Sequence, residues 1–449
     1  MLKHIQLNNL GPAPSLELTL RPRLNLITGD NGLGKSFLLD VAWWALTRKW
    51  PAEINPQLTA GQKAVPRQSG EATIDFAFSG KSKDEQYLST YQRREQAWTG
   101  RSGRPSNPGL VVYAMADGSF AVWDPARNYW RTQNGMDVQD RPPAYVFTPA
   151  QVWNGLPGES GNWLCNGLIR DWASWQREGG EAFNHLSAVL NVLSPSAQEP
   201  LVAGDLTRIS PDDVRDMPTL RMPYGNDVAV LHASSGMRRI MALAYFLVWC
   251  WSEHQQAATK LLDEPTTNQV VFLVDEVESH LHPQWQRTIV PALLKVMQSL
   301  IAGAEVQLLA VTHSPLVMAS VEPEFDPARD AWFDLDLVAS HPQGVPTVAL
   351  TQRPFVRLGE VGRWLVSDAF DLASARSVQA EQALNEAATL LAQSPVDHAQ
   401  ARALDARLRG LLGDTDPFWI RWRFVGEKPP MSDYLSLPPE TVDNPQRSA

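Results

Sequence analysis

Alternating apolar and polar residues dominate the first part of the chain. In residues 1–28 the apolar side chains alternate with polar ones in two or three short runs, and a similar alternation covers residues 71–79. Both patterns predict half-buried antiparallel strands. Residues 110–123 are apolar on either side of Asp117-Gly118, a turn dipeptide, and this predicts a β-hairpin. We therefore expect much antiparallel sheet in the first 150 residues.

Further along, apolar residues recur with the spacing of a helix. This spacing covers residues 158–193 and returns in 380–391 and 401–412. The polar segment 81–108 has no such pattern, and we expect it to form a mobile surface excursion. The expected organisation is a head over residues 1–350 with a largely antiparallel β lobe at 60–150 and a helical insertion at 151–218, and then a C-terminal helical region at 351–449 with a disordered tail.

Composition narrows the class of protein. The chain has 449 residues, of which 44% are hydrophobic and 20% charged, which is typical of a soluble globular protein with two or three lobes. Its net charge of −10 argues against a general nucleic-acid coat, so any nucleic-acid contact would need a local basic patch or a partner. Only Cys165 and Cys250 occur, and the apolar run 240–251 is too short to span a bilayer. We expect a cytoplasmic protein without a membrane partner.

The strongest local motif is G-x-x-x-x-G-K-S at residues 29–36. An apolar strand precedes it and an apolar helix follows it, which is the context of a phosphate-binding loop. Backbone amides and the helix N-terminus would hold the α and β phosphates, Lys35 would reach the β and γ oxygens, and the Ser36 hydroxyl would ligate Mg²⁺. The predicted nucleotide-binding residues in this loop are Gly29, Asn31, Gly32, Gly34, Lys35 and Ser36.

Two pairs of neighbouring carboxylates compete for the acidic position of such a site. Asp275-Glu276 follows the apolar run 270–274, which has the length of a buried strand. Asp263-Glu264 follows only two apolar residues, so we interpret it as part of a loop. We assign Asp275 to Mg²⁺ and Glu276 to polarising the attacking water.

Other polar residues stand at the ends of predicted strands. Gln151 follows the apolar run 144–147 and would reach Mg²⁺ and the attacking water, while His313 ends the run 306–311 and would sense the γ-phosphate. His280 and His282 lie close to Glu278, but not with the i, i+4 spacing that metal-ligating helices use. We therefore predict no separate transition-metal site there.

A helix with small residues at its start begins at Ser234-Ser235-Gly236. An N-capping serine followed by small residues forms an anion site, although alone it would indicate only a well-capped helix. Its position between the phosphate loop and the acidic strand also matters, because the order of the motifs along the chain is itself informative.

The order of these motifs resembles that of the ABC-type ATPase superfamily, in particular its soluble SMC and RecF-like branch. The resemblance implies an α/β P-loop head with a mixed or parallel core sheet, ATP and Mg²⁺ as cofactors, and two heads that face each other. Ser234, Ser235 and Gly236 would then contact the nucleotide of the partner head, and His280 would lie in the loop that crosses the dimer interface. Glu276 and His313 would be the catalytic residues, and Ser36, Asp275 and Gln151 the metal-binding ones.

The strings at residues 276–283 and 312–315 look most like ATPases of bacterial anti-phage systems, Septu-like and overcoming-lysogenization-defect proteins. The latter append a Toprim nuclease with an Asp-x-Asp motif. Here Asp334-Leu335-Asp336 has too little chain after it for that fold, and we interpret it as a solvated strand edge. The resemblance therefore implies ATP-driven head dimerisation that controls a separate effector subunit, a nuclease or toxin.

Other functions stay open at this point. A RecF-like DNA repair ATPase would bind DNA directly, a transporter subunit would need a membrane partner, and a self-contained nuclease would cleave alone. Aromatic residues interleaved with Arg421 and Arg423 would suit stacking on nucleic acid. For these aromatics we expect packing against the head or a partner instead, and for the scattered tryptophans in general, of which the chain has 17, packing in a core or a lobe interface.

Overall fold

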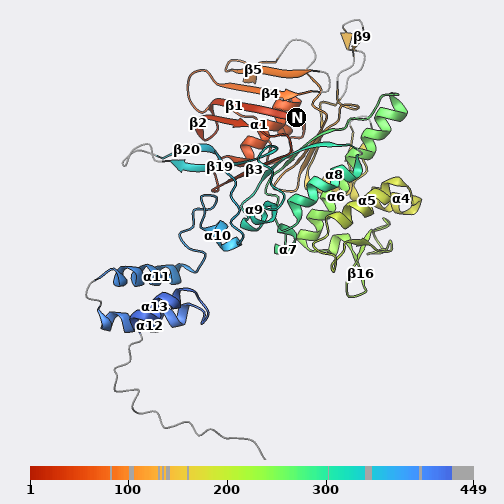
Figure 1. Cartoon of the computed structure of the whole chain (residues 1–449). Helices are drawn as coiled ribbons and strands as arrows, with labels where there is room; N and C mark the ends of the chain where they lie inside the picture. The colour runs from red at the N-terminus through yellow and green to blue at the C-terminus, as the bar shows by residue number, and fades with distance from the viewer. Residues whose placement is uncertain are drawn as a thin grey trace, which may run out of the picture. The chain divides into compact units, whose positions relative to one another are not determined.

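The structure is a computed structural model of the whole chain (Figure 1). It describes residues 1–80, 83–100, 106–129, 132–133, 136–137, 142–158, 161–301, 303–338, 346–393 and 397–426. The chain divides into two compact units, Met1–Phe370 and Asp371–Ala449. The first unit is the head that carries all the motifs above. Its end lies beyond residue 350 because the helix α10 (Val361–Leu365) places Trp364 in the hydrophobic core of the head.

An eight-stranded mixed sheet forms the centre of the head. Its order is β11-β8-β7-β17-β18-β3-β19-β20. In that order the strands are Tyr145–Phe147, Phe120–Trp123, Leu110–Ala114, Gln269–Val274, Glu305–Val311, Leu24–Gly29, Asp330–Val338 and Thr347–Arg353. From β7 to β19 all neighbours are parallel, so the carboxyl ends of β17, β18 and β3 lie side by side at one edge. The predicted hairpin at 110–123 is confirmed as β7 and β8.

A second, antiparallel sheet has the order β2-β1-β4-β5-β6. These strands are Ala13–Thr19, Leu2–Leu10, Thr73–Ser79, Asp84–Gln92 and Ala97–Trp98. Helix α1 (Lys35–Thr47) shares one hydrophobic cluster with both sheets, since its Trp43 and Trp44 pack together with Phe76 of β4 and Val271 of β17. Figure 1 shows α1 beside the strands of this lobe. The phosphate loop therefore leads into a helix that is buried along most of its length.

Helices cover the opposite face of the core sheet (Figure 1). Strand β17 shows why the core sheet needs cover on both faces. Its Val270 and Phe272 pack on the helical side, while its Val271 and Leu273 pack on the side of α1. The covering helices are α3 (Pro149–Asn154), α4 (Leu168–Glu178), α5 (Glu181–Val192), α6 (Ser235–Gln255), α7 (Pro283–Gln286), α8 (Ile289–Leu300) and α9 (Pro315–Val321). The expected α/β fold with a mixed core sheet and an antiparallel lobe is confirmed.

Small elements complete the head. The insertion that contains α4 and α5 also holds the hairpin β12–β13 and a three-stranded sheet of β14, β15 and β16. Short helices occur at α2 (Pro51–Ile54) and at Val230–His232, a π-helical turn follows α6 at Gln256–Leu261, and β9 (Thr132–Gln133) pairs with β10 (Met136–Asp137). In chain order, strands β12 to β16 of the insertion are Leu156–Pro157, Trp163–Cys165, Val202–Ala203, Thr219–Arg221 and Asp227–Ala229.

The expectation of a mobile excursion at residues 81–108 is wrong for its described part. Strand β5 pairs with the whole length of β4, and β6 pairs with the end of β5. The polar composition of this segment concealed the strand because two of its inward positions carry Glu85 and Ser89, which are both fully buried. Ser106 donates a hydrogen bond to Glu85, and Ser89 donates to the Thr99 carbonyl.

The expectation of a solvated strand edge at Asp334-Leu335-Asp336 is also wrong. Strand β20 extends the sheet beyond β19, and Asp334 is buried with 2% of its surface exposed. Its carboxylate accepts a hydrogen bond of 2.8 Å from Thr28 and forms an ion pair with Arg353. Asp334 therefore stabilises the strand that precedes the phosphate loop.

The second unit is a small helical module. Helices α11 (Val378–Leu391), α12 (His398–Leu411) and α13 (Phe418–Gly426) surround a core of their own that includes Trp419 and Trp422. The expected packing role of these two aromatics is confirmed. Arg421 is exposed, whereas the side chain of Arg423 and the predicted disordered end at 438–449 lie outside the described residues.

None of the helices in the described ranges is long and apolar enough to cross a membrane. The apolar run 240–251 forms the middle of α6, whose side chains pack in the head core. It is a buried helix, as its length predicts.

Candidate active site

The motif at 29–36 forms a loop between the end of β3 and the start of α1. Gly29 and Gly34 both have positive φ, at 130° and 96°. A Cβ atom at Gly29 would lie 2.2 Å from the Leu335 carbonyl oxygen, and one at Gly34 would lie 2.8 Å from Pro12. Glycine is therefore required at both positions. Asn31, Gly32 and Ser36 are exposed at the mouth of the loop.

The Lys35 ammonium is held inside this loop. It is 5% exposed and donates hydrogen bonds to the carbonyls of Gly29 (2.8 Å) and Asp30 (2.6 Å). Burial lowers the pKa of Lys35, while the charges of Asp275, Asp30 and other nearby carboxylates act in the opposite direction. A cation poised over a ring of amides, beside carboxylates, is the arrangement that a polyphosphate with a divalent metal would complete.

Asp275 follows directly after β17, two strands away from β3. Burial raises the pKa of its carboxyl, and a hydrogen bond from Ser36 opposes this rise. Its Oδ1 atom is buried and has no hydrogen-bond partner among the described residues. A buried carboxylate oxygen without a donor, beside a serine hydroxyl, fits the oxygen-rich site that Mg²⁺ requires. Asp275 and Ser36 would hold the metal.

Glu276 stands next to Asp275 with a left-handed backbone, φ 46°. This is unusual for a residue other than glycine or asparagine and sets the direction of its side chain at the end of the strand. The side chain is half-buried, and its charge influences the pKa values of Lys35, Asp275 and His313. Glu276 therefore lies within electrostatic reach of the loop and of both neighbouring strand ends.

Glu278 links the ends of β17 and β18, and sequence reasoning did not assign it to the site. Its carboxylate accepts a 2.7 Å hydrogen bond from the Thr312 hydroxyl and another from the backbone N–H of His313. Burial raises the pKa of Glu278, and these two donors counteract the rise. Burial together with the Lys35 charge lowers the pKa of His313, while the charges of Glu276 and Asp30 oppose this effect. A carboxylate four positions after the end of a strand was the available signal.

The start of α6 lies close to the loop that follows Glu278. Ser234 caps the helix by accepting a hydrogen bond from the Met237 N–H, and both Ser234 and Ser235 are exposed. Gly236 is buried, and a Cβ atom there would lie 2.7 Å from the His280 carbonyl oxygen. The first turn of α6 is therefore packed directly against the His280 loop of the same chain, with its serines facing outward.

Arg239, in the next turn of α6, was also missed. It donates hydrogen bonds of 3.3 Å to the Ala116 carbonyl and 3.4 Å to the Asp275 carbonyl. Burial lowers its pKa, and the nearby carboxylates of Asp117, Asp275 and Glu276 oppose that effect. The signal in the sequence is an arginine followed by an almost uninterrupted apolar helix. Arg239 ties the orientation of α6 to the position of the acidic strand.

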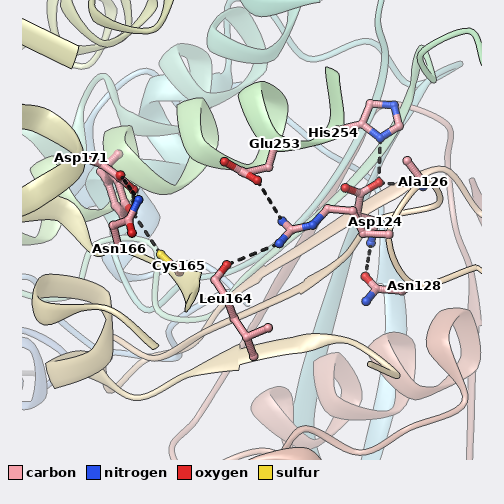
Figure 2. Close-up of polar contacts among 11 residues, drawn as sticks. Asp124, Ala126, Asn128, Leu164, Cys165, Asn166, Asp171, Glu253 and His254 are labelled. Atoms are coloured by element: carbon pink, nitrogen blue, oxygen red, sulfur yellow. Dashed lines mark hydrogen bonds and ion pairs between the residues drawn. The ribbon is translucent and has the colours of Figure 1, made fainter. Parts of the chain in front are cut away.

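The far end of α6 is held by buried polar contacts (Figure 2). His254 and Asp124 are both 2% exposed by side chain and lie 2.7 Å apart, and the backbone N–H of Thr267 donates to the other imidazole nitrogen. Midway along the helix, the Tyr245 hydroxyl donates to Asp171 of α4 at 2.7 Å. Because both contacts are buried, α6 is fixed to the body of the head along its length.

The remaining candidates lie elsewhere or are engaged. Gln151 is the third residue of α3, and its side chain accepts hydrogen bonds from the Thr148 N–H and the Asn55 amide. It forms a capping box, and its role as a metal ligand stays a prediction. Asp263 and Glu264 lie in an exposed loop after the π-helical turn, outside any strand.

Comparison with known proteins now gives the family. A model described as "AAA domain, putative AbiEii toxin, Type IV TA system" matches residues 24–319, which span the phosphate loop and all the strand ends above. The chain belongs to this AAA-domain family. The expected likeness to ATPases of bacterial defence systems is confirmed by its relatives.

Among these relatives, the Septu protein PtuA of Bacillus thuringiensis is 21% identical over 320 residues, which cover 70% of this chain and 72% of that protein. The Retron Vc95 probable ATPase of Vibrio cholerae serotype O1 biovar El Tor is 28% identical over 120 residues, 27% of this chain and 21% of its own length. The Retron Ec83 probable ATPase of Escherichia coli is 29% identical over 101 residues, 22% of this chain and 16% of the relative. The chain thus spans well under half of the two retron proteins.

Among solved structures, the SMC head domain from Thermotoga maritima is similar at 16% identity, covering 79% of this chain and 99% of that one, with a TM-score of 0.38. An SMC head bound to the C-terminal winged-helix domain of ScpA covers 78% of this chain and 97% of its own, at 14% identity and a TM-score of 0.41.

Proposed function

We propose that this member of the AAA-domain family is a Mg²⁺-dependent ATPase. Its heads would join face to face around ATP, and their joining and parting would control a separate effector subunit in a defence module. The observation that carries the proposal is the meeting of Lys35, Asp275 and His313 at one edge of the core sheet, from three adjacent strands. Phosphoryl transfer depends on positioned charge around the γ-phosphate, and this edge supplies it.

Each residue then has a defined task. The amides of Gly32 and Gly34 and the Lys35 ammonium would bind the phosphates, and the bound Mg²⁺ would neutralise charge on the β and γ oxygens. Glu276 would accept a proton from the attacking water, which it can do because its carboxylate lies beside the loop. His313, whose backbone is held by Glu278, would donate a hydrogen bond from its imidazole to the γ-phosphate.

The outward position of Ser234 and Ser235 supports the dimer. Their hydroxyls lie on the surface of the head, where a second copy would meet them. A single head leaves one side of the γ-phosphate to water, and the serines of a facing head would close that side. Hydrolysis would then remove the group that both heads share, and the heads would part.

The effector is supported by kinship and not by a site in this chain. A Septu protein and two retron ATPases are relatives, so we propose a shared type of system in which the ATPase acts as the switch. The effector would be a nuclease or another toxin, and the pull-down described below would identify it.

The test of the switch is to compare Glu276→Gln with Lys35→Ala by light scattering after size exclusion, with and without Mg²⁺-ATP. We expect Glu276→Gln to accumulate as a dimer with ATP because it binds but does not hydrolyse, while Lys35→Ala stays monomeric because it does not bind. Equal association of both variants in ATP would contradict the assignment.

The test of the effector is a pull-down of tagged Glu276→Gln protein from its native host in the presence of ATP. A second protein in fixed ratio to the ATPase is expected. If nucleic acid is recovered without any protein, the direct DNA-binding function of RecF-like ATPases replaces this proposal.

A further inference from the structure

A cavity lies in the head, at the C-terminal end of α1. It has a volume of about 350 Å³, within the range of cavities that hold small ligands. Five aromatic rings from three parts of the chain line it: Trp44, Trp50, Trp98, Trp123 and Tyr129. The cavity thus gathers tryptophans that are scattered in the sequence.

The rings form two groups on the wall. Trp44 stacks on Trp50 with centroids 5.5 Å apart and also contacts Trp98 at 5.9 Å. Trp123 meets Tyr129 edge to face at 6.1 Å. Flat indole walls that are already braced by one another favour a flat, aromatic ligand, because such a ligand adds a further stacking layer without disturbing the existing pairs.

The charges on the cavity wall indicate whether a bound ligand would be cationic or anionic. Aromatic cages often hold quaternary ammonium groups. Here three cations line the cavity, which are Arg48, Lys49 and Lys63. Arg48 is paired with the buried Glu85 at 3.8 Å. Glu53 is paired with Lys63 at 3.2 Å, whereas the exposed Lys49 has no carboxylate partner in the described ranges. The local charge therefore opposes a cationic ligand and favours an anionic one.

The cavity is separate from the phosphate loop. Lys35 and Ser36 begin α1, and Trp44, Leu46 and Thr47 at its end line the cavity. A helix of 13 residues is roughly 20 Å long at 1.5 Å per residue. A nucleotide bound at the loop would project its phosphates toward the N-terminus of α1, so it cannot fill a cavity at the other end.

We propose that this cavity binds a nucleobase by stacking, with the attached phosphate paired to the Lys49 ammonium at its wall. The base comes either from a free mononucleotide or from a single strand of nucleic acid. The observations behind this are the braced aromatic walls, the uncompensated charge of Lys49 and the volume. The proposal does not depend on the ATPase function, because it uses none of the residues at the sheet edge.

The test uses the full chain carrying Lys35→Ala, so that the phosphate loop does not compete. Deoxynucleoside monophosphates and a single-stranded DNA of about 12 nucleotides are titrated separately by calorimetry. We expect binding that is weakened about tenfold by Trp98→Ala, the loss typical of one stacked base. Lys49→Glu is expected to weaken the binding by a similar factor and to change no other property of the protein. Tight binding of the monophosphates identifies a free nucleotide as the source, and preference for the strand identifies nucleic acid.

Matched controls keep the result specific. Trp163 is half exposed on the insertion and Lys260 is an exposed lysine after α6, so Trp163→Ala and Lys260→Glu should leave the affinity unchanged. Lys49→Glu changes only an exposed charge and preserves folding even if Trp98→Ala does not. Absence of binding by every probe, or equal weakening in the control variants, would overturn the proposal.

Discussion

At the scale of single residues, the candidate site depends on carboxylates with different surroundings. Glu276 is half-buried beside the loop, Asp275 has a buried oxygen without a donor, and Glu278 is saturated with two donors. In the proposed mechanism the same functional group would therefore have three tasks, which are to activate water, to hold a metal and to fix the backbone of a histidine. Their environments, and not their residue types, separate these tasks.

Replacing Glu278 by glutamine should slow hydrolysis without preventing ATP binding. The two donors use different carboxylate oxygens and the amide has only one, so either the Thr312 hydroxyl or the His313 N–H loses its acceptor and the strand end is held less firmly. Hydrogen bonds to a charged group contribute about 1.5–3 kcal/mol, which corresponds to a loss of roughly 10–100-fold in kcat. Glu264→Gln, in the exposed loop, is the control, and steady-state ATPase assays with separate binding titrations give the answer. An equal effect of the control, or loss of ATP binding by Glu278→Gln, would contradict this role.

Asp40 should make stability depend on pH. Burial raises its pKa to about 7, and the Tyr113 hydroxyl donates a hydrogen bond to it at 3.0 Å. In the unfolded chain an aspartate titrates near pH 4, so the folded state binds the extra proton between about pH 4 and 7 and stability falls as the pH rises through that window.

Asp40→Asn removes this titration and keeps an acceptor for Tyr113. Its melting temperature relative to the natural protein should therefore rise between pH 5 and pH 8, measured without nucleotide or Mg²⁺. Asp212→Asn, at an exposed aspartate, should show no such trend. A constant difference for Asp40→Asn across this range would show that the carboxyl does not retain its proton.

At the scale of elements, α6 connects the exposed serines to the acidic strand. Its first turn packs on the His280 loop, Arg239 donates to the Asp275 carbonyl, and its far end is fixed through His254 and Asp124. A rigid helix held at both ends transmits a displacement of one end to the strand beside it. Contact of a second head with the serines would thus reach Asp275 through α6.

Gly236→Ala tests this connection. The added Cβ would overlap the His280 carbonyl, a backbone atom, so the loop or the helix must shift. We expect ATP binding to persist while ATP-dependent association of Glu276→Gln protein is lost. Gly410→Ala is the matched control, because an added Cβ there meets open space in α12 and alanine favours a helix by about 0.5–1 kcal/mol. Normal ATP-dependent association of the Gly236→Ala variant would show that the packing of α6 on the His280 loop is not needed for dimerisation.

At the scale of the whole molecule, the two units have separate cores. Among the residues that the structure describes, the head clusters contain none from α11, α12 or α13, and the helical module has its own core around Trp419 and Trp422. Self-contained cores predict independent folding. We propose that the head ends at Phe370 and not at residue 350.

A chain that ends at Phe370 should therefore fold and bind ATP as the full chain does. A chain that ends at Leu350 should be less stable, because it loses the buried Trp364 and leaves Glu322 without the 2.6 Å hydrogen bond from its indole. Loss of a buried tryptophan costs about 3–5 kcal/mol. Thermal unfolding of both chains, together with ATP titration, checks this. Equal stability of the two would place the boundary at 350.

The sequence by itself determined the features that are contiguous in the chain. The phosphate loop follows from the order of glycine, lysine and serine between an apolar strand and a helix, and β17 follows from five consecutive apolar residues before Asp275. These features are local, because strand burial and loop conformation are set by neighbouring residues. Likewise the hairpin of β7 and β8 was predictable from its turn.

Only the tertiary structure decided which distant residues meet. Glu278 reaches His313 because β17 and β18 are neighbours, and Asp334 is buried because β20 covers the edge of β19. The buried polar positions of β5 hid a strand, and α1 brought the rings of the cavity together. Such contacts depend on the order of strands in the sheets, which no local pattern of apolar and polar residues specifies.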